Sequence, residues 1–566
     1  GSQSLKTNTT GLRNSALGYN SLQANTGGAS NSAFGTGALA ANTTGGCNTG
    51  MGHNASADNT TGANNTAVGF QALMDNTTGT ANTGLGKDSL IANTTASCNT
   101  AIGSSAAKCT TTGCQNTAVG QQAFFTNTTG DNNTALGRAA LLLSTTADNN
   151  TAVGWYALGA NTTASRSTAI GRCALTSNTT GDANTAVGDL AMEDCTTGDL
   201  NTAIGTESLK NLTTGCYNVA LGRSSAESLT TADNNTALGY LALQSNTTAD
   251  NNTAVGFEAL KDNTTGTVNT AMGRQALQNN TTADSNTAFG HNSLNTTTTG
   301  GCNTAVGGSA LFNNTSTVNT AVGHNTLQAN TSGNSNTAVG QQALYSNTTA
   351  SDNVAVGREA MYTNTTGHSN VAIGHDAGYL NTTGCRNVYI GMEAGHNSTT
   401  PEGNTFVGRQ AGCNAVSGNN NVAIGQSAGI DAVKNITGSE THQLVLGSNS
   451  LTNAFMKVSF TVTSDLRDKT EIEEVPHGLD FVNKINPIKY RFMVSREDPV
   501  GTGNKKYGFS AQEILELEGD NNVIIDNHDP ENLKLTELHL VPVLVNAIKE
   551  LSEENKDLKS RIEALE

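Results

Sequence analysis

The stretch Asn65-Thr66-Ala67-Val68-Gly69 opens a pattern of 17 residues that recurs along most of the chain. The full pattern is Asn-Thr-Ala-Val-Gly-x-x-Ala-Leu-x-x-Asn-Thr-Thr-Gly-x-x. Its glycine recurs every 17 residues from Gly18 to Gly307 and, after one step of 16, from Gly323 to Gly425, and Gly447 closes the series. A fixed period this short indicates a solenoid, in which each repeat is one coil and its neighbours supply the core.

We expect a mostly β fold, because 17 residues are too few for a helical hairpin and suit a short strand with tight turns. Thr-Ala-Val is the expected strand, ended by a glycine where a Cβ would obstruct the turn, and Asn-Thr-Thr-Gly is a turn signal. The Val-type and Leu-type residues are expected to stack as an interior apolar column, with Asn and Thr forming polar ladders between coils. The small alanine columns should allow neighbouring chains to approach closely (Ala67, Ala118, Ala135, Ala152).

Composition and charge change abruptly at residue 464. Residues 464–566 hold 22 of the 46 acidic and 13 of the 29 basic side chains, together with five of the six prolines. We therefore expect a repetitive region over 1–447, a linker over 448–463 and a second domain over 464–566. The net charge of −17 argues against a nucleic-acid partner, and no apolar run is long enough for membrane insertion.

The residue after each coil glycine is the most variable one, and we expect this column to be exposed. Aromatic side chains there make Trp155, Tyr240 and Phe257 candidates for binding a receptor, because rings stack on sugars. Unselected surface variation is the alternative. The repetitive region shows no paired carboxylates of the glycosidase kind, and its Thr rows are too interrupted by Asn and Arg for an ice-binding face.

No metal or cofactor site is expected, since the ten cysteines lack the spacing of metal ligands. Cys98 and Cys114 lie nearly one repeat apart and could pair, with Cys109 as the rival partner, or all three could be free thiols in turns. Asn-Thr-Thr is also an acceptor pattern for N-glycosylation, but its presence in nearly every coil is explained more simply by turn chemistry.

The C-terminal hundred residues indicate an α+β domain. Residues 478–485 form an amphipathic helical pattern, 488–492 alternate like a strand, and 507–514 run from a strand end into a helix. A heptad seam follows and predicts a coiled coil over 541–566, with Asn555 setting its register. The pattern fits a dimer at least as well as a trimer. Its members are Val541, Leu544, Ile548, Leu551, Asn555, Leu558, Ile562 and Leu565.

Residues 464–566 resemble the endosialidase-type intramolecular chaperone family. The resemblance rests on Ser464-Asp465-x-Arg467-x-Lys469, on Gly478-Leu479-Asp480, on the segment 485–492 and on Gly508 to Glu513, in that order. It implies a domain that trimerises, guides the upstream β-structure to fold and then cuts itself off. The serine–lysine dyad of the family falls on Ser464 and Lys469, with Thr463–Ser464 as the bond that is cut.

The repeats resemble the coils of trimeric adhesin heads and phage fibre shafts, which are parallel β-rolls with strands ending in Ile-Gly or Val-Gly. Ile102-Gly103, Val119-Gly120 and Ile373-Gly374 carry this resemblance.

Self-cleavage by this dyad is chemically reasonable. A serine hydroxyl needs a nearby base, and a lysine can act as one only if burial lowers its pKa, which a trimer interface would provide. We therefore expect a single-turnover self-cleaving peptidase with no further enzyme activity.

The two resemblances together predict a homotrimeric viral tail fibre or spike, located in the virion and made in the host cytoplasm. Its partner would be a host cell-surface glycan or protein. The alternatives are a cellular trimeric adhesin and a glycan-degrading tailspike.

Overall fold

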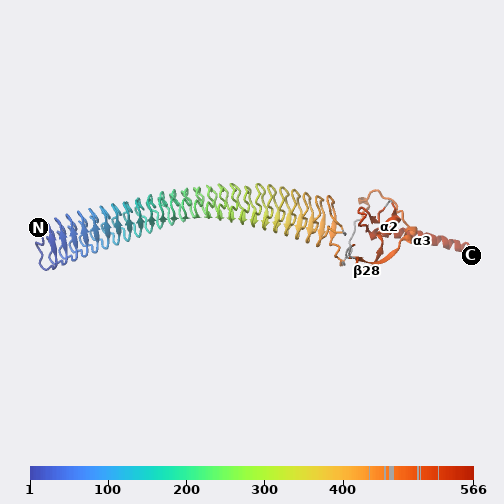
Figure 1. Cartoon of the computed structure of the whole chain (residues 1–566), viewed down its shortest axis with the longest axis horizontal. Coiled ribbons are helices and arrows are strands. Elements are labelled where there is room, and N and C mark those ends of the chain that lie inside the picture. The colour runs from blue at the N-terminus through green and yellow to red at the C-terminus, as the bar shows by residue number, and fades with distance from the viewer. Residues whose placement is uncertain (432–433, 452–453, 458–463, 494–495, 497–498, 520–521) are drawn as a thin grey trace. The chain divides into compact units, whose positions relative to one another are not determined.

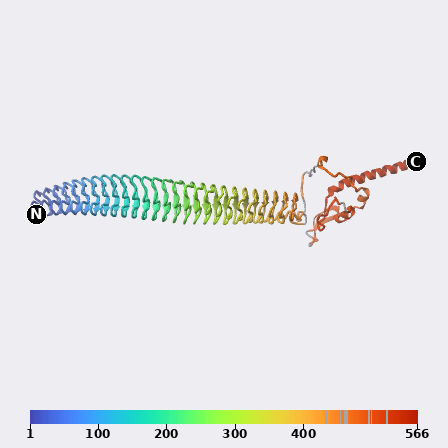
Figure 2. The ribbon, with the colours of Figure 1, turned by 90° about the horizontal axis from the view of Figure 1, so that it is seen from above.

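A computed structural model describes residues 1–431, 434–451, 454–457, 464–493, 496, 499–519 and 522–566. The chain divides into two compact units, Gly1–Asn404 and Thr405–Glu566. The first unit is a stack of coils that follow one another in sequence order (Figure 1), and each coil contributes one three-residue strand. Figure 2 shows the same stack from above.

The strands of the first unit are β1 (Ser15–Leu17), β2 (Ser32–Phe34), β3 (Thr49–Met51), β4 (Thr66–Val68), β5 (Thr83–Leu85), β6 (Thr100–Ile102), β7 (Thr117–Val119), β8 (Thr134–Leu136), β9 (Thr151–Val153), β10 (Thr168–Ile170), β11 (Thr185–Val187), β12 (Thr202–Ile204), β13 (Val219–Leu221), β14 (Thr236–Leu238), β15 (Thr253–Val255), β16 (Thr270–Met272), β17 (Thr287–Phe289), β18 (Thr304–Val306), β19 (Thr320–Val322), β20 (Thr337–Val339), β21 (Val354–Val356), β22 (Val371–Ile373) and β23 (Val388–Ile390).

Each strand from β1 to β22 pairs in parallel with the strand of the next coil, residue for equivalent residue. Thr66 lies opposite Thr83 and Val68 opposite Leu85, and the same register holds along the unit. The one coil of 16 residues does not disturb it, because Thr304 still lies opposite Thr320. The prediction of a mostly β solenoid with 17-residue coils is confirmed.

The interior is filled by alanine and leucine, and the prediction that the Val-type residue lies inside is wrong. Successive strand residues face opposite sides. The central alanine therefore points inward, as Ala118 does at 0% exposure, while Ile170 at the strand end is 40% exposed. The leucine that follows in the turn fills the remaining interior. The alanine columns are accordingly core, not a surface for close approach of chains: Ala67, Ala118, Ala135 and Ala152 are all fully buried.

Two buried asparagine ladders run between the coils, as the pattern predicted. In the first, the Asn76 amide donates to Asn59 Oδ1 (2.7 Å) and to the carbonyl of Gly79 (3.1 Å). In the second, the Asn48 backbone amide donates to Asn31 Oδ1 (2.9 Å). Because the first ladder consists of the asparagines of Asn-Thr-Thr, their amide nitrogens are bonded inside the coil, and the motif acts there as turn and ladder.

Most coils place three residues other than glycine in the left-handed region. In the coil that begins at Asn65 these are Gln71, Leu73 and Ala81, with φ of 54°, 50° and 57°. Such a conformation costs an L-residue roughly 1–2 kcal/mol. The coil is therefore not a locally preferred structure, and stacking on its neighbours has to stabilise it. The strand-ending glycine is sterically required, since a Cβ on Gly69 would lie 2.5 Å from the carbonyl oxygen of Gly86.

The second unit starts with three more coils and continues into an α+β domain. Its elements are β24 (Thr405–Val407), β25 (Val422–Ile424), β26 (Leu444–Leu446), the 3₁₀ turn η1 (Leu466–Asp468), α1 (Leu479–Lys484), β27 (Pro487–Met493), β28 (Gly501–Phe509), α2 (Ala511–Glu518), β29 (Ile525–Asp526), β30 (Lys534–Leu535), the 3₁₀ turn η2 (Glu537–His539) and α3 (Leu540–Glu563). The helices and strands predicted after residue 477 are all present. None of the helices among the described residues combines the length and apolar character that crossing a bilayer requires.

The α+β domain has a conventional apolar core, to which α1, α2 and α3 contribute Phe481, Ile514 and Leu540. Contacts between residues distant in sequence hold it together. The backbone amide of Leu479 donates to Glu550 Oε2 of α3 (2.6 Å), across 71 residues. The nearly buried Glu518 carboxylate accepts three backbone amides from residues 523–525, at 2.7–3.0 Å.

Candidate functional site

The turn η1 brings the two predicted catalytic side chains together. Asp465 caps this turn, its side chain accepting the backbone amide of Arg467 (2.9 Å). The backbone amide of Lys469 then donates to the carbonyl of Leu466 (3.2 Å), which turns the chain back on itself. As a result Lys469 Nζ donates a hydrogen bond of 2.8 Å to Ser464 Oγ.

Asp465 and Arg467 hold this turn, a role that their spacing alone did not reveal. The Arg467 guanidinium donates to both Asp465 carboxylate oxygens, through Nε at 3.0 and 3.1 Å and through Nη2 at 2.5 Å. These hydrogen bonds lower the pKa of the Asp465 carboxyl and raise that of Arg467. An exposed ion pair adds little stability, so its importance is geometric: it fixes the backbone between serine and lysine.

The dyad lies at the surface. Ser464 and Lys469 are both exposed, and Thr463, the other predicted residue of the cleavage site, lies outside the described residues. A single chain thus supplies the serine–lysine contact without burying it.

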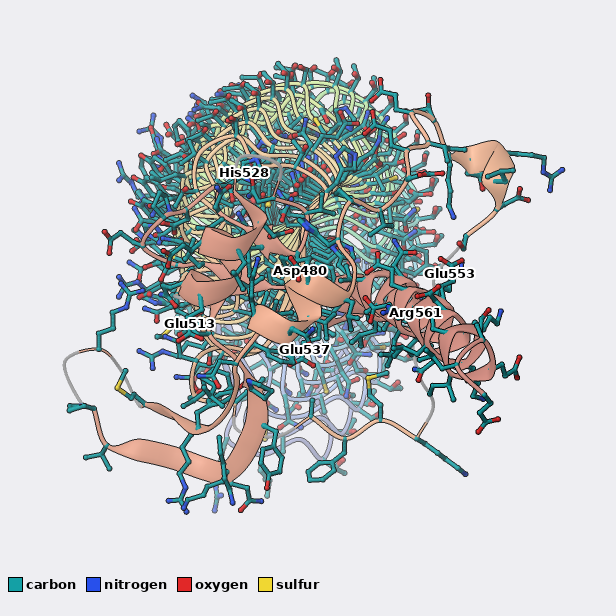
Figure 3. The ribbon with its side chains drawn as sticks, turned by 90° about the vertical axis from the view of Figure 1, so that its right-hand side faces the viewer. Asp480, Glu513, His528, Glu537, Glu553 and Arg561 are labelled. Carbon is teal, nitrogen blue, oxygen red and sulfur yellow. The ribbon has the colours of Figure 1, made fainter. Side chains whose placement is uncertain are left out.

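Helix α3 carries two apolar faces. One packs on the domain core through Leu540, Val543 and Ala547, each at most 5% exposed. The other is the predicted heptad seam, whose side chains are exposed, for example Ile548 at 65%. Figure 3 shows charged side chains such as Glu553 and Arg561 projecting from the same helix. An apolar seam on a helix that is otherwise charged is typical of a coiled-coil surface.

A second apolar surface follows the coils of the first unit. We call it the strand-end stripe, and it consists of the last residue of every strand from β1 to β23. All are Val, Ile, Leu, Met or Phe, and they are partly or fully exposed, as Leu136 is at 44%. An apolar stripe of this length is unusual for the surface of a soluble monomer and marks an interaction surface.

The column of residues that follow the coil glycines in the first unit is exposed at most positions, as predicted. We call it the post-glycine column. It consists of Tyr19, Thr36, His53, Phe70, Lys87, Ser104, Gln121, Arg138, Trp155, Arg172, Asp189, Thr206, Arg223, Tyr240, Phe257, Arg274, His291, Gly308, His324, Gln341, Arg358, His375 and Met392.

The three predicted binding residues do not form one group within this column. The rings of Tyr240 and Phe257 stack, with centroids 5.5 Å apart and planes inclined by 25°. Trp155 lies several coils away, tilted against its sequence neighbour Tyr156 at 5.9 Å. Of the three predicted residues, Tyr240 and Phe257 therefore share one surface and Trp155 lies apart from it.

No disulfide bond joins any of the ten cysteines, all of which lie in the described part of the chain. The pairing considered for Cys98 is not formed, and Cys114 Sγ instead accepts the backbone amide of Ser97 (3.3 Å). Burial raises the pKa of the Cys195 thiol to about 12.

Comparison with known protein families points to the same end of the chain. Residues 464–524 match the model of a family described as chaperone of endosialidase. No curated protein and no solved structure gives a significant match. The matched segment begins on Ser464 and ends before α3, so the match describes one part of the α+β domain, and the earlier resemblance over 464–566 extends beyond it.

Proposed function

We propose that the chain is a homotrimeric fibre whose residues 464–566 act as an intramolecular chaperone and are then released by self-cleavage between Thr463 and Ser464. The observation that carries this proposal is the 2.8 Å contact between Lys469 Nζ and Ser464 Oγ at the first residue of the segment that matches the chaperone family. In this proposal residues 1–447 are the shaft and residues 448–463 the linker, and α3 forms the coiled coil of residues 541–566.

The reaction follows from the position of the serine directly after the bond to be cut. Ser464 Oγ would attack the carbonyl carbon of Thr463, so that a C–O bond forms and the C–N bond breaks. Neutral Lys469 would take the hydroxyl proton and return it to the amine of Ser464 that leaves. Water would then hydrolyse the resulting ester. The dyad is exposed in the single chain, and we infer that its burial between assembled chains activates the reaction.

Two exposed apolar surfaces support association of three parallel copies. The heptad seam on α3 would join the C-terminal ends, and the strand-end stripe would bury its Val and Ile side chains between shafts. Each fully buried side chain of this size contributes about 1.5–3 kcal/mol. The stripe repeats with the coil, so copies pack best when equal coils lie side by side.

The need for a chaperone follows from the structure of the coil. Most coils contain three left-handed residues that are not glycine, so a short segment has little tendency to nucleate by itself. Unpaired strand edges also invite wrong pairing. A C-terminal domain with its own apolar core would fold first, bring three chains into register and let the shaft form from that end.

We propose that the finished fibre belongs to a virion, as a tail fibre or spike made in the host cytoplasm, and that its shaft binds a host surface glycan or protein. The chaperone family match and the trimer-forming surfaces support this more than a cellular adhesin or a glycan-degrading spike.

Self-cleavage is tested by expressing the full chain and separating the products on a denaturing gel. The unchanged protein should release a fragment that begins at Ser464, confirmed by N-terminal sequencing, whereas Ser464→Ala and Lys469→Ala should stay intact. Lys484→Ala removes another exposed lysine of the same domain and should be cut normally. Cleavage of Ser464→Ala at the wild-type rate would refute the mechanism.

A further inference from the structure

The post-glycine column concentrates positive charge on an otherwise acidic unit. Residues 1–404 contain 13 lysines and arginines, and six of them lie in this column. The same residues contain 22 aspartates and glutamates, of which only Asp189 lies in it. The column is therefore a narrow basic line along an acidic shaft.

Five successive coils form an uninterrupted run of basic and aromatic residues within the post-glycine column. They place Arg223, Tyr240, Phe257, Arg274 and His291 one behind another. Beyond the stacked Tyr240–Phe257 pair, the Arg274 guanidinium lies 5.7 Å from the Phe257 ring centroid. Arg274 Nη1 also approaches His291 Nε2 at 3.3 Å. Both rings are 42% exposed, so a pair of solvent-exposed rings lies between the two arginines.

The two arginines of this surface are available to a ligand. Elsewhere in the column Arg172 is held by Asp189 through Nε at 2.7 Å and Nη2 at 2.9 Å. Within the described part of the chain, neither Arg223 nor Arg274 forms an ion pair with a carboxylate. An unpaired guanidinium at the surface can offer its fork to a carboxylate or a sulfate.

We propose that the Arg223–His291 surface binds a linear acidic polysaccharide that runs along the column. This inference rests on the proposed function of a surface-binding fibre and adds the chemical class of its ligand. Equivalent positions recur at the strand spacing of about 4.8 Å, so a polymer with repeated anionic groups can meet Arg223 and Arg274 in turn. Between them the exposed rings offer apolar surface to the sugar.

The charge around the column makes the site selective. Since acidic residues outnumber basic ones over the rest of the unit, a polyanion is repelled except along the column. A nucleic acid carries a dense phosphate backbone and gains affinity from many basic contacts at once. One cation every few coils favours instead a polymer with widely spaced charges and apolar sugar faces.

The test measures binding of the purified, self-cleaved trimer to immobilised polygalacturonate and dextran sulfate, which separate carboxylate from sulfate recognition. Neutral dextran and single-stranded DNA serve as further arms. We expect binding to at least one acidic polysaccharide and none to dextran. Arg223→Glu with Arg274→Glu should weaken it at least tenfold. The control, Arg166→Glu with Arg386→Glu, makes the same charge change at exposed sites outside the column and should bind like wild type.

Replacing the two aromatic rings tests whether binding depends on more than nonspecific attraction between charges. Tyr240→Ala with Phe257→Ala should weaken binding several-fold at fixed salt while leaving the salt dependence unchanged, because no charge is removed. Wild-type affinity in either double variant, equal binding of dextran, or tighter binding of DNA would overturn the inference. These outcomes in a protein that still trimerises and cleaves leave the proposed function intact, whereas loss of trimer and cleavage in the unchanged protein would refute that function instead.

Discussion

The shaft and the α+β domain of this chain are stabilised in opposite ways. Shaft contacts join residues one coil apart, as in the Asn76–Asn59 amide bond, and each coil depends on its neighbours. The α+β domain joins residues as distant as Leu479 and Glu550 around one apolar core. The first coil of such a stack forms with little stability because it has no neighbour to pack on, whereas a domain with a closed core can fold as a unit. The contrast indicates which part can direct the folding of the other.

The largest expected effect comes from removing residues 464–566 before synthesis. Without that domain the shaft should be insoluble or fail to trimerise, because nothing sets the register of its first coils. The same shaft released after folding should remain a soluble trimer. Size-exclusion chromatography with light scattering measures both states. A soluble trimer from the truncated gene would remove the basis for the contrast between the two regions.

Charges placed in the strand-end stripe should separate the chains next. Ile170→Asp with Ile204→Asp would bury unpaired carboxylates between shafts, at a cost of several kcal/mol each, and the trimer should dissociate. The control, Thr36→Asp with Thr206→Asp, adds the same charge to the post-glycine column and should leave the trimer intact. Light scattering distinguishes the outcomes, and an intact trimer in the stripe variant would show that the shafts associate through another face.

A smaller effect is expected from removing one side chain of the buried asparagine ladder. Asn76→Ala deprives Asn59 and Asn93 of their partner, and each unsatisfied polar group costs about 1–3 kcal/mol. The shaft should lose stability in thermal unfolding, while Thr78→Ala, at an exposed position of the same turn, should change it by less than about 0.5 kcal/mol. Equal stability of the two variants would mean that the ladder is not what holds neighbouring coils.

The smallest effect concerns thiol reactivity within the shaft. Burial raises the pKa of Cys195 from 9.0 to about 12, so its thiolate is disfavoured in the folded coil. The stability linked to this thiol is present below pH 9 and is lost as the pH rises towards 12. At pH 8 iodoacetamide should label the exposed Cys47 and spare Cys195, as mass spectrometry can show, whereas both should react after denaturation. Equal labelling in the folded protein would argue that the coil opens locally.

The repeat period was sufficient to predict the solenoid, its strands and its asparagine ladders, since each follows from spacing and turn chemistry. The period did not reveal which apolar residue faces inward. Side chains in Thr-Ala-Val alternate between the two faces of the strand, so either the alanine or its two neighbours could face the interior. Alanine is small enough to lie on either face. The structure places Ala118 inside because the leucine of the turn already occupies the interior. Hydropathy alone favours burial of the larger Val, and for this reason the prediction that Val-type residues fill the interior was wrong.

The candidate site was predictable in part. The spacing of Ser464 and Lys469 was visible in the sequence, but the bond between them depends on a 3₁₀ turn that Asp465 caps and Arg467 secures. The sequence identifies Asp465 and Arg467 only as members of a motif and does not indicate that they fix the turn. The binding surface was harder to predict. In the sequence Trp155, Tyr240 and Phe257 are equivalent aromatic residues of one column, and the stacking geometry is what separates Trp155 from the other two.

The coil of 16 residues between Thr304 and Thr320 bears on how such a chain can evolve. Pairing there survives the loss of a residue from the turn, because the register is set strand to strand. A whole coil can therefore be added or deleted without altering the coils on either side of it. The length of the coil stack thus becomes a variable that can change independently of the α+β domain. Inserting or deleting one coil changes the length of the stack by about 4.8 Å and leaves the C-terminal residues unchanged.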